Sequence, residues 1–225
     1  MKKDAAYRIK RMTATAMFGA LSYACMMLIK IPVSFLTLDV KDALIILCSL
    51  LFGPLSGAII AVLVPFLEMI TVSGTGVYGF IMNVLSSLTF ALVTGLVYRY
   101  KKSMTGAIVS LTSGVFAVTA VMMLANLLIT PHYIGGTAAD VAAMIPKLLL
   151  PFNLVKATLN AAIVLLLYKP LSRILKKIGF LHSSVSATQD PQERKQGVVR
   201  SVCITVAAIA VIAVSLAIIF FVLKK

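Results

Sequence analysis

The stretch ALIILCSLLFGPLSGAIIAVLVPFLEMIT, residues 43–71, decides the fold of this chain, because it determines how often the chain crosses a membrane. The stretch is apolar throughout and is interrupted at Phe52-Gly53-Pro54. Proline lacks the backbone N–H that a helix needs, and it disfavours helical backbone in the preceding residue. The stretch is therefore either one kinked helix or two helices, and the charges on both sides must choose between them.

The composition places the chain in lipid. Of the 225 residues 60% are hydrophobic and 12% are charged, and the mean hydropathy is +1.04, well outside the range of soluble domains. The 21 Lys and Arg against 7 Asp and Glu give a net charge of +14. In a membrane protein such an excess reflects loops held in the cytoplasm. We therefore expect the lipid bilayer as surroundings and no nucleic acid as partner.

Other apolar segments are also long enough to cross the hydrocarbon core, which takes about 20 residues. Short cytoplasmic loops are enriched in Lys and Arg. With the basic N-terminus inside, the cluster YRYKK at 98–102 falls on the same side only if residues 43–71 cross twice. We therefore predict an all-α membrane protein with seven spans, its N-terminus in the cytoplasm and its C-terminus outside. The first crossing of residues 43–71 is short, so the loop at 30–42 is expected to dip below the surface. The other predicted spans are 12–29, 77–98, 104–129, 148–168 and 198–223.

The segment SGTGVYGF, residues 73–80, has the G-x-G-x-x-G spacing of a dinucleotide-binding loop. That spacing has a physical meaning only between a strand and a helix, whereas here it joins two predicted spans on the outer side. The glycines either let backbone approach a ligand or a helix closely, or form a simple flexible turn.

Motifs of catalysis and metal binding are absent from the sequence. There is no G-x-x-x-x-G-K-[ST] and no H-E-x-x-H, and Cys25, Cys48 and Cys203 have no metal-type spacing. His132 and His182 are isolated. We therefore expect no catalytic residue, no metal and no cofactor.

Lys156 lies inside a predicted span. A lysine at this depth costs at least a few kcal/mol on insertion scales, so it should face a cavity or a partner. Snorkelling to the headgroups is difficult from a position so far into the span. Asn153 and Asn160 lie three residues before and four after it, on the same helix face.

Glu68, Asn83 and Asn126 are further polar residues at plausible membrane depth, all near the outer ends of their spans. They either join helices by hydrogen bonds or line one pocket together with Lys156. Such a pocket, with amides, a single cation and the aromatic neighbours Tyr78, Tyr133 and Phe152, suits a flat heteroaromatic ligand.

The first span carries small residues four apart, at Ala16, Ala20 and Ala24. Such a stripe lets another helix pack closely, either from within the chain or from a membrane partner. The spacing of the alanines does not show whether that helix belongs to this chain or to a membrane partner.

Several segments in order resemble one family, the substrate-binding S components of energy-coupling factor (ECF) vitamin transporters. The resemblance covers about residues 8–178. ANLLITPHYIG and LLPFNLVKATLN are similar to the riboflavin-specific members, and the other segments are common to S components. These segments are the alanine stripe, LTLDVKD (36–42), FGPLSGAIIAVL (52–63), ANLLITPHYIG (125–135) and LLPFNLVKATLN (149–160).

The resemblance implies a six-transmembrane-helix bundle in a bacterial cell membrane that captures a vitamin, here riboflavin or a related flavin, from outside. Uptake would then require an ECF transmembrane coupling subunit and two ATPase subunits, with the alanine stripe as the docking surface. The resemblance makes Asn126, Asn153 and Lys156 the polar contacts of the ligand. The full set of expected substrate-binding residues adds Leu38, Asp39, Glu68, Gly76, Tyr78, Asn83 and Tyr133.

The chain departs from the family after residue 178. We predict a six-helix S-component domain at 1–178, a polar cytoplasmic linker at 179–197 and one extra C-terminal transmembrane helix at 198–225. That helix is an anchor, a contact for another partner or a limit on reorientation.

Three alternatives to riboflavin binding stay open. The same architecture could bind another vitamin or a flavin nucleotide. An intramembrane enzyme would use Lys156, Glu68 and His132, and an assembly factor would use its polar groups only to join helices.

Overall fold

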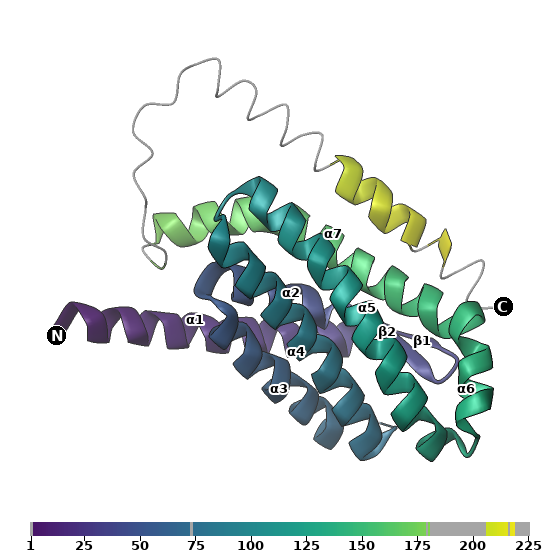
Figure 1. The fold of residues 1–225 in the computed structure, drawn as a ribbon. Coiled ribbons are helices and arrows are strands. Elements are labelled where there is room, and N and C mark those ends of the chain that lie inside the picture. The colour runs from purple at the N-terminus through teal and green to yellow at the C-terminus, as the bar shows by residue number, and fades with distance from the viewer. Residues whose placement is uncertain (1, 73, 179, 181–205, 216, 219–225) are drawn as a thin grey trace.

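The computed structural model describes residues 2–72, 74–178, 180, 206–215 and 217–218, and within them the chain is a bundle of helices with one short hairpin (Figure 1). After the last helix of the bundle, residues Val206–Ser215 are also helical. The elements in order are α1 (Lys2–Leu28), β1 (Lys30–Val33), β2 (Leu36–Asp39), α2 (Lys41–Phe52), α3 (Pro54–Thr71), α4 (Gly76–Tyr100), α5 (Met104–Ile134), α6 (Ala138–Met144), a π-helical turn (Ile145–Leu149) and α7 (Leu150–Lys177).

Residues 43–71 form two helices, as the charge pattern predicts. Helix α2 ends at Phe52, and α3 begins at Pro54, where the missing N–H of proline costs no helical hydrogen bond. Gly53 joins them with a φ of 98°, which a side chain would strain. At 12 residues, α2 is about 18 Å long and cannot cross a hydrocarbon core of about 30 Å by itself.

The hairpin supplies part of the missing depth. Strands β1 and β2 pair antiparallel, with Lys30 opposite Asp39 and Val33 opposite Leu36. Leu38 and Asp39 are buried, so the loop at 30–42 does dip into the protein. From the sequence we expected a loop here, and the hairpin is the exception within the otherwise helical described chain. Ile31, Val33 and Thr37 are β-branched, and such residues favour a strand over a helix in a segment this short.

Among the described residues, four helical stretches are long and apolar enough to cross a membrane: Pro54–Thr71, Gly76–Tyr100, Met104–Ile134 and Ala138–Leu175. The chain is therefore a multi-pass membrane protein. The fourth stretch combines α6, the π-helical turn and α7, and α6 was not foreseen as a separate helix.

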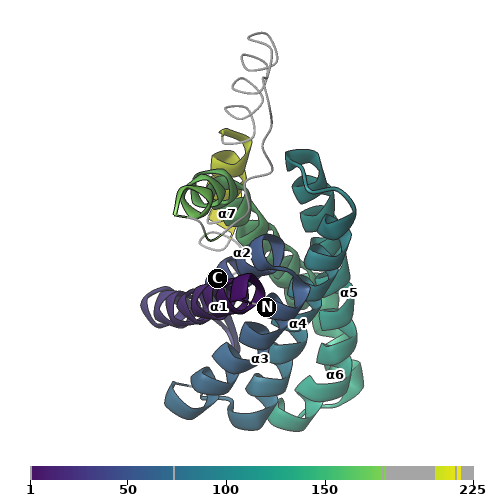
Figure 2. The same cartoon turned by 90° about the vertical axis from the view of Figure 1, so that its left-hand side faces the viewer.

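Helix α2 lies in the middle of the bundle and contacts α1, α3, α4 and α7 (Figure 2). Helices α3 and α4 both approach α2 closely. A Cβ added at Gly57 would lie 2.5 Å from the Cβ of Ser49, and one at Gly95 would overlap its Oγ. Ser49 Oγ in turn donates to the carbonyl of Ala91 at 2.6 Å. Small residues thus bring three helices together, as is usual in lipid.

The alanine stripe of α1 points away from the bundle. Ala16, Ala20 and Ala24 are exposed, whereas Ala14 and Phe18 on another face of α1 belong to the core. The stripe therefore does not serve packing within the described part of the chain.

The described C-terminal helix lies beside α7 (Figure 1). Its Ile212, together with Ile218, packs against a buried cluster formed by the hairpin and the first turns of α7. The cluster comprises Val33, Leu38, Phe152, Val155 and Leu159. The predicted linker 179–197 lies outside the described residues except for Phe180, and so do residues 198–205 and 219–225 of the predicted seventh span.

Candidate functional site: a charged network below the hairpin

A cavity lies under the turn of the hairpin, which we call the hairpin cavity. Its volume is about 80 Å³, and one side of it is apolar and aromatic while the other is polar. Four segments form it: the hairpin, the first turns of α4, the second half of α5 and the first turns of α7. The lining residues are Phe35, Leu36, Thr37, Thr75, Gly79, Met82, Asn83, Ser86, Met122, Tyr133, Phe152, Asn153 and Lys156.

Lys156 extends from α7 to the hairpin. Its ammonium lies 2.9 Å from Asp39 Oδ2 and 3.4 Å from the carbonyl oxygen of Thr37. An ammonium has three N–H donors, so one donor has no partner among the described residues. The side chain is 11% exposed and lines the cavity. Lys156 can therefore donate a hydrogen bond to a bound molecule.

Lys41, at the start of α2, differs from Lys156 because it has no N–H donor left for a bound molecule. Its ammonium lies 3.0 Å from Asp39 Oδ2, 3.0 Å from Glu68 Oε2 and 3.2 Å from Asn83 Oδ1. These contacts use all three donors, and the side chain is fully buried. Lys41 thus joins the hairpin to α3 and α4, and it is not among the residues that line the cavity.

Glu68 accepts from both sides of the network. Its Oε1 lies 3.2 Å from the ammonium of Lys30 on β1, and Asn83 Nδ2 donates to its Oε2 at 3.2 Å. Asn83 also accepts from Lys41 and lines the cavity. Its amide therefore connects the cavity wall to the buried charges.

Asn160 fixes the hairpin and α2 to α7. Its Oδ1 accepts from the backbone N–H of Ala43 at 2.8 Å, and its Nδ2 donates to the carbonyl of Asp39 at 3.2 Å. One turn below the network, Ser87 donates to Asp42 Oδ1. Asp39 Oδ1 is buried and has no hydrogen-bond partner among the described residues.

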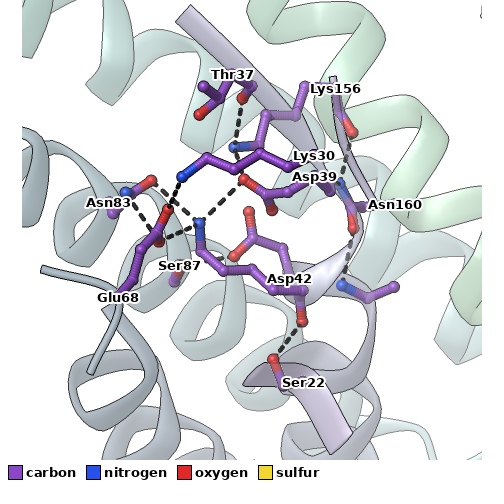
Figure 3. Close-up of polar contacts among 12 residues, drawn as sticks. Ser22, Lys30, Thr37, Asp39, Asp42, Glu68, Asn83, Ser87, Lys156 and Asn160 are labelled. Atoms are coloured by element: carbon purple, nitrogen blue, oxygen red, sulfur yellow. Dashed lines mark hydrogen bonds and ion pairs between the residues drawn. The ribbon is translucent and has the colours of Figure 1, made fainter. Parts of the chain in front are cut away.

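The network joins three lysines, at 30, 41 and 156, to two carboxylates, Asp39 and Glu68, by ion pairs of 2.9–3.2 Å. Lys156 reaches Asp39 and Lys30 reaches Glu68 (Figure 3). The ammonium groups of Lys156 and Lys41 both lie within 3.0 Å of Asp39 Oδ2 and compensate the negative charge of that carboxylate. Paired in this way, the buried charges avoid the large cost of isolated ions.

Three aromatic rings meet above the cavity. Tyr133, at the end of α5, contacts Phe35 of the hairpin turn edge to face, with the ring centroids 6.1 Å apart. It also stacks with Tyr78 of α4, with the ring centroids 6.2 Å apart. Three separate segments thus come together through one tyrosine. We call these three residues the aromatic lid.

The expected substrate-binding residues fall into three groups. Asn83, Tyr133, Asn153 and Lys156 line the cavity. Leu38, Asp39 and Glu68 are buried beside it, as a packing residue and two ion-pair partners. Tyr78 belongs to the aromatic lid, and Gly76 is exposed at the start of α4 with a φ of 55°.

Asn126 is the one of the three polar contacts implied by the resemblance that is not among the described lining residues of the cavity. It is fully buried, its Nδ2 donates to the carbonyl of Met122 at 2.7 Å, and its Oδ1 accepts from Thr130 at 2.9 Å. Met122, one turn before it, does line the cavity. As a ligand contact, Asn126 stays a prediction that requires its side chain to turn.

Lys156 is the cation among the described lining residues of the cavity, and from the sequence we did not foresee that Lys30 and Lys41 join it in the charged network beside the cavity. The segment KIPVSFLTLDVKD contained the signal, because it places charged residues at both ends of an alternating, β-branched run. A hairpin with Lys30 opposite Asp39 brings those charges together, but reading the run as a loop hid the pairing.

The geometry defines a membrane-embedded binding protein: a helical bundle with a small cavity at one end, one available ammonium and aromatic walls. Residues 10–168 match the family described as "ECF transporter, substrate-specific component". The chain belongs to this family. It is thus a transporter component and not an enzyme.

Two curated relatives cover most of the chain. It is 28% identical over 179 residues to the riboflavin transporter RibU of Staphylococcus aureus (strain TCH60), covering 75% of this chain and 94% of the relative. It is 25% identical over 177 residues to the riboflavin transporter FmnP of Bacillus subtilis (strain 168), covering 72% and 91%.

A solved structure described as "Structure and mechanism of the S component of a bacterial ECF transporter" is also similar. Its TM-score is 0.65 at 27% identity, covering 75% of this chain and 99% of the other.

Proposed function

We propose that this chain is the riboflavin-binding subunit of its transporter and that riboflavin binds in the hairpin cavity. The observation that carries the proposal is the ammonium of Lys156, which Asp39 holds at the cavity wall with one donor unused. The two curated relatives, both riboflavin transporters by name, support the same ligand.

The chemistry of the cavity suits an isoalloxazine ring. Such a ring is flat and has carbonyl acceptors and an imide N–H along one edge. Lys156 can donate to a carbonyl, and the amides of Asn153 and Asn83 can both donate and accept. Phe152 and Tyr133 provide apolar surface for the faces of the ring.

The cavity must enlarge for this ligand. Sites for organic molecules of such size usually measure roughly 300–1,000 Å³, whereas the hairpin cavity measures about 80 Å³. The aromatic lid is the part that can separate, because Phe35, Tyr78 and Tyr133 come from three different segments and touch through their rings. We assign the structure to a closed arrangement that opens to admit the vitamin.

The orientation follows from the charges. The cluster at 98–102 and the basic C-terminal turns of α7 lie at the end of α4 and α7 opposite to the cavity. With that basic end in the cytoplasm, the hairpin cavity faces outside. The vitamin is captured there, and partner subunits supply the ATP hydrolysis for uptake: a transmembrane coupling subunit, which contacts the alanine stripe of α1, and two ATPases.

Quenching of flavin fluorescence by the purified protein tests the ligand. Riboflavin should bind saturably, and a vitamin without a flavin ring, such as thiamine, should not compete. Flavin mononucleotide in the same titration distinguishes the free vitamin from its phosphate ester. Failure of every flavin to bind a folded protein would refute the assignment.

A further inference from the structure

A second, larger cavity lies at the other end of the bundle, which we call the basic cavity. Its volume is about 580 Å³. It is formed by the N-terminal part of α1, the α2–α3 turn, the last turns of α4 and the second half of α7. Its lining residues are Tyr7, Arg11, Ser49, Leu50, Leu51, Phe52, Gly53, Pro54, Leu55, Gly95, Tyr98, Arg99, Lys102, Tyr168 and Ser172.

The charges of this cavity are all positive. Arg11, Arg99 and Lys102 line it, and no acidic residue is among the lining residues of the described chain. Arg99 and Lys102 are exposed and form no ion pair within the described residues. Unlike the network below the hairpin, these three cations are not neutralised by carboxylates around them.

Arg11 is held so that most of its donors stay available. Its Nε donates to Ser56 Oγ at 2.9 Å, in the first turn of α3. The four N–H groups on its two terminal nitrogens are not used by that contact. A guanidinium that is fixed at Nε can still donate hydrogen bonds to an anion from its two terminal nitrogens.

The start of α3 adds to the positive potential. Gly53, Pro54 and Leu55 line the cavity, and no side chain caps this 18-residue helix at its N-terminus. The N-terminal end of a helix dipole attracts anions. The hydroxyl groups of Tyr98 and Tyr168, which contact each other in the wall, are further hydrogen-bonding groups.

The other wall of the cavity is apolar and reaches the lipid-facing surface. Leu50 and Phe52 are buried, while Leu55 is 64% exposed. A molecule that touches both walls has an anionic end and a hydrocarbon end. A free phosphate would fill only the basic part and leave the leucine wall uncovered.

We propose that the basic cavity binds the headgroup of an anionic phospholipid from the leaflet at this end of the bundle, which we assign to the cytoplasm. The phosphate lies among Arg11, Arg99 and Lys102, and the glycerol and first acyl carbons lie against Leu51 and Leu55. Cytoplasmic leaflets are rich in anionic lipid, and basic groups at their surface bind it. This lipid would hold the bundle at a defined depth, independently of the vitamin in the hairpin cavity.

The test uses the full chain in nanodiscs of phosphatidylcholine, with and without phosphatidylglycerol. Lipid retention is measured by native mass spectrometry and stability by the thermal unfolding midpoint. The variant R99Q/K102Q removes two lining charges. The control K101Q/R173Q removes two exposed charges at the same end of the bundle that do not line the cavity.

Phosphatidylglycerol should raise the unfolding midpoint of the wild type and of K101Q/R173Q and remain bound to both. R99Q/K102Q should keep its midpoint in phosphatidylcholine but lose most of the added stabilisation. Its affinity for the anionic lipid should fall roughly thirtyfold, since each basic residue near an anionic surface contributes about fivefold.

Three results would overturn the proposal. If R99Q/K102Q and K101Q/R173Q lost the same share of the stabilisation by phosphatidylglycerol, the anionic lipid would be attracted to any basic surface at this end of the bundle and not to the cavity. Full stabilisation by soluble glycerol phosphate in phosphatidylcholine nanodiscs would make a free phosphate the ligand. Unchanged lipid binding by R99Q/K102Q, with weaker assembly with the coupling subunit, would make the cavity a protein-docking site.

Discussion

The ammonium of Lys156 and Oδ2 of Asp39 lie 2.9 Å apart, although the two residues are 117 positions apart in the chain. The same carboxylate oxygen also accepts from Lys41 at 3.0 Å. One carboxylate oxygen thus fixes two lysines, of which one is buried in the network and the other faces the cavity. The direction of Lys156 is therefore determined by the hairpin as well as by α7.

Replacement of Lys156 by alanine should weaken riboflavin binding by roughly tenfold to 150-fold. A hydrogen bond from a charged group contributes about 1.5–3 kcal/mol, and its loss leaves a ligand carbonyl unpaired. The protein should still insert and fold, because Asp39 keeps its contact with Lys41. The measurement is a fluorescence-quenching titration.

Lys147→Ala is the matched control, since Lys147 is an exposed lysine on the π-helical turn before α7. Its affinity should equal that of the wild type. If Lys156→Ala also bound riboflavin normally, the ammonium would serve only to join the hairpin to α7.

Asp39→Asn should lower both stability and affinity. Breaking a buried ion pair by removing one partner costs about 3–5 kcal/mol, because the other charge stays buried. Here Lys41 would keep Glu68, whereas Lys156 would keep only the carbonyl of Thr37. The double variant Asp39→Asn/Lys156→Met should therefore be more stable than Asp39→Asn alone. Chemical unfolding of the two variants in detergent measures the difference.

The sequence was sufficient to predict the two helices at 43–71, because Pro54 cannot be inside a helix without cost and the cluster at 98–102 requires an even number of crossings. It also singled out Lys156, because a lysine in hydrocarbon needs a partner. It did not show that partner to be Asp39. An ion pair across 117 residues depends on how the hairpin folds onto α7, and no local pattern encodes that contact.

The burial of Lys41 was also beyond the sequence. A lysine before an apolar helix is usually a solvated end, and only the positions of Glu68 and Asn83 on α3 and α4 make burial possible. From the sequence we also did not predict α6 and the π-helical turn as separate elements. Residues 138–149 are apolar enough to continue a span, and Pro146 interrupts them without ending the helical path.

Gly95→Ala should destabilise the bundle by about 1–3 kcal/mol, as overpacking of a core usually does. The added methyl group would overlap Ser49 Oγ and lie 3.0 Å from the Cα of Pro54, which is backbone and cannot turn away. A lower thermal unfolding midpoint is expected. Gly74→Ala is the control, because a Cβ there meets open space. An unchanged midpoint for Gly95→Ala would contradict the close packing of α2 and α4.

Ala20→Trp should leave riboflavin binding intact and abolish transport in cells that supply the partner subunits. Ala20 is exposed on α1 and lines no described cavity, so the bulky ring should not disturb the bundle. It would prevent another helix from approaching the stripe. Uptake of labelled riboflavin and binding by the purified variant are compared.

Phe116→Trp on α5 controls for a tryptophan on an exposed apolar surface, since Phe116 is 66% exposed. Transport by this variant should be normal. Normal transport by Ala20→Trp as well would show that the coupling subunit does not contact the stripe.

Tyr133→Ala should increase both the association and the dissociation rate of riboflavin. Tyr133 holds the aromatic lid together, since Phe35 and Tyr78 each contact it. Without its ring, the hairpin turn and the start of α4 lose their connection to α5, and opening no longer separates stacked surfaces. Aromatic pairs contribute about 0.5–1.5 kcal/mol each, so the loss of two pairs predicts an increase in the opening rate of roughly fivefold to 150-fold. Stopped-flow fluorescence quenching measures both rates. Tyr133→Phe keeps the ring and should have wild-type rates, so faster exchange in that variant would assign the effect to the hydroxyl and not to the lid.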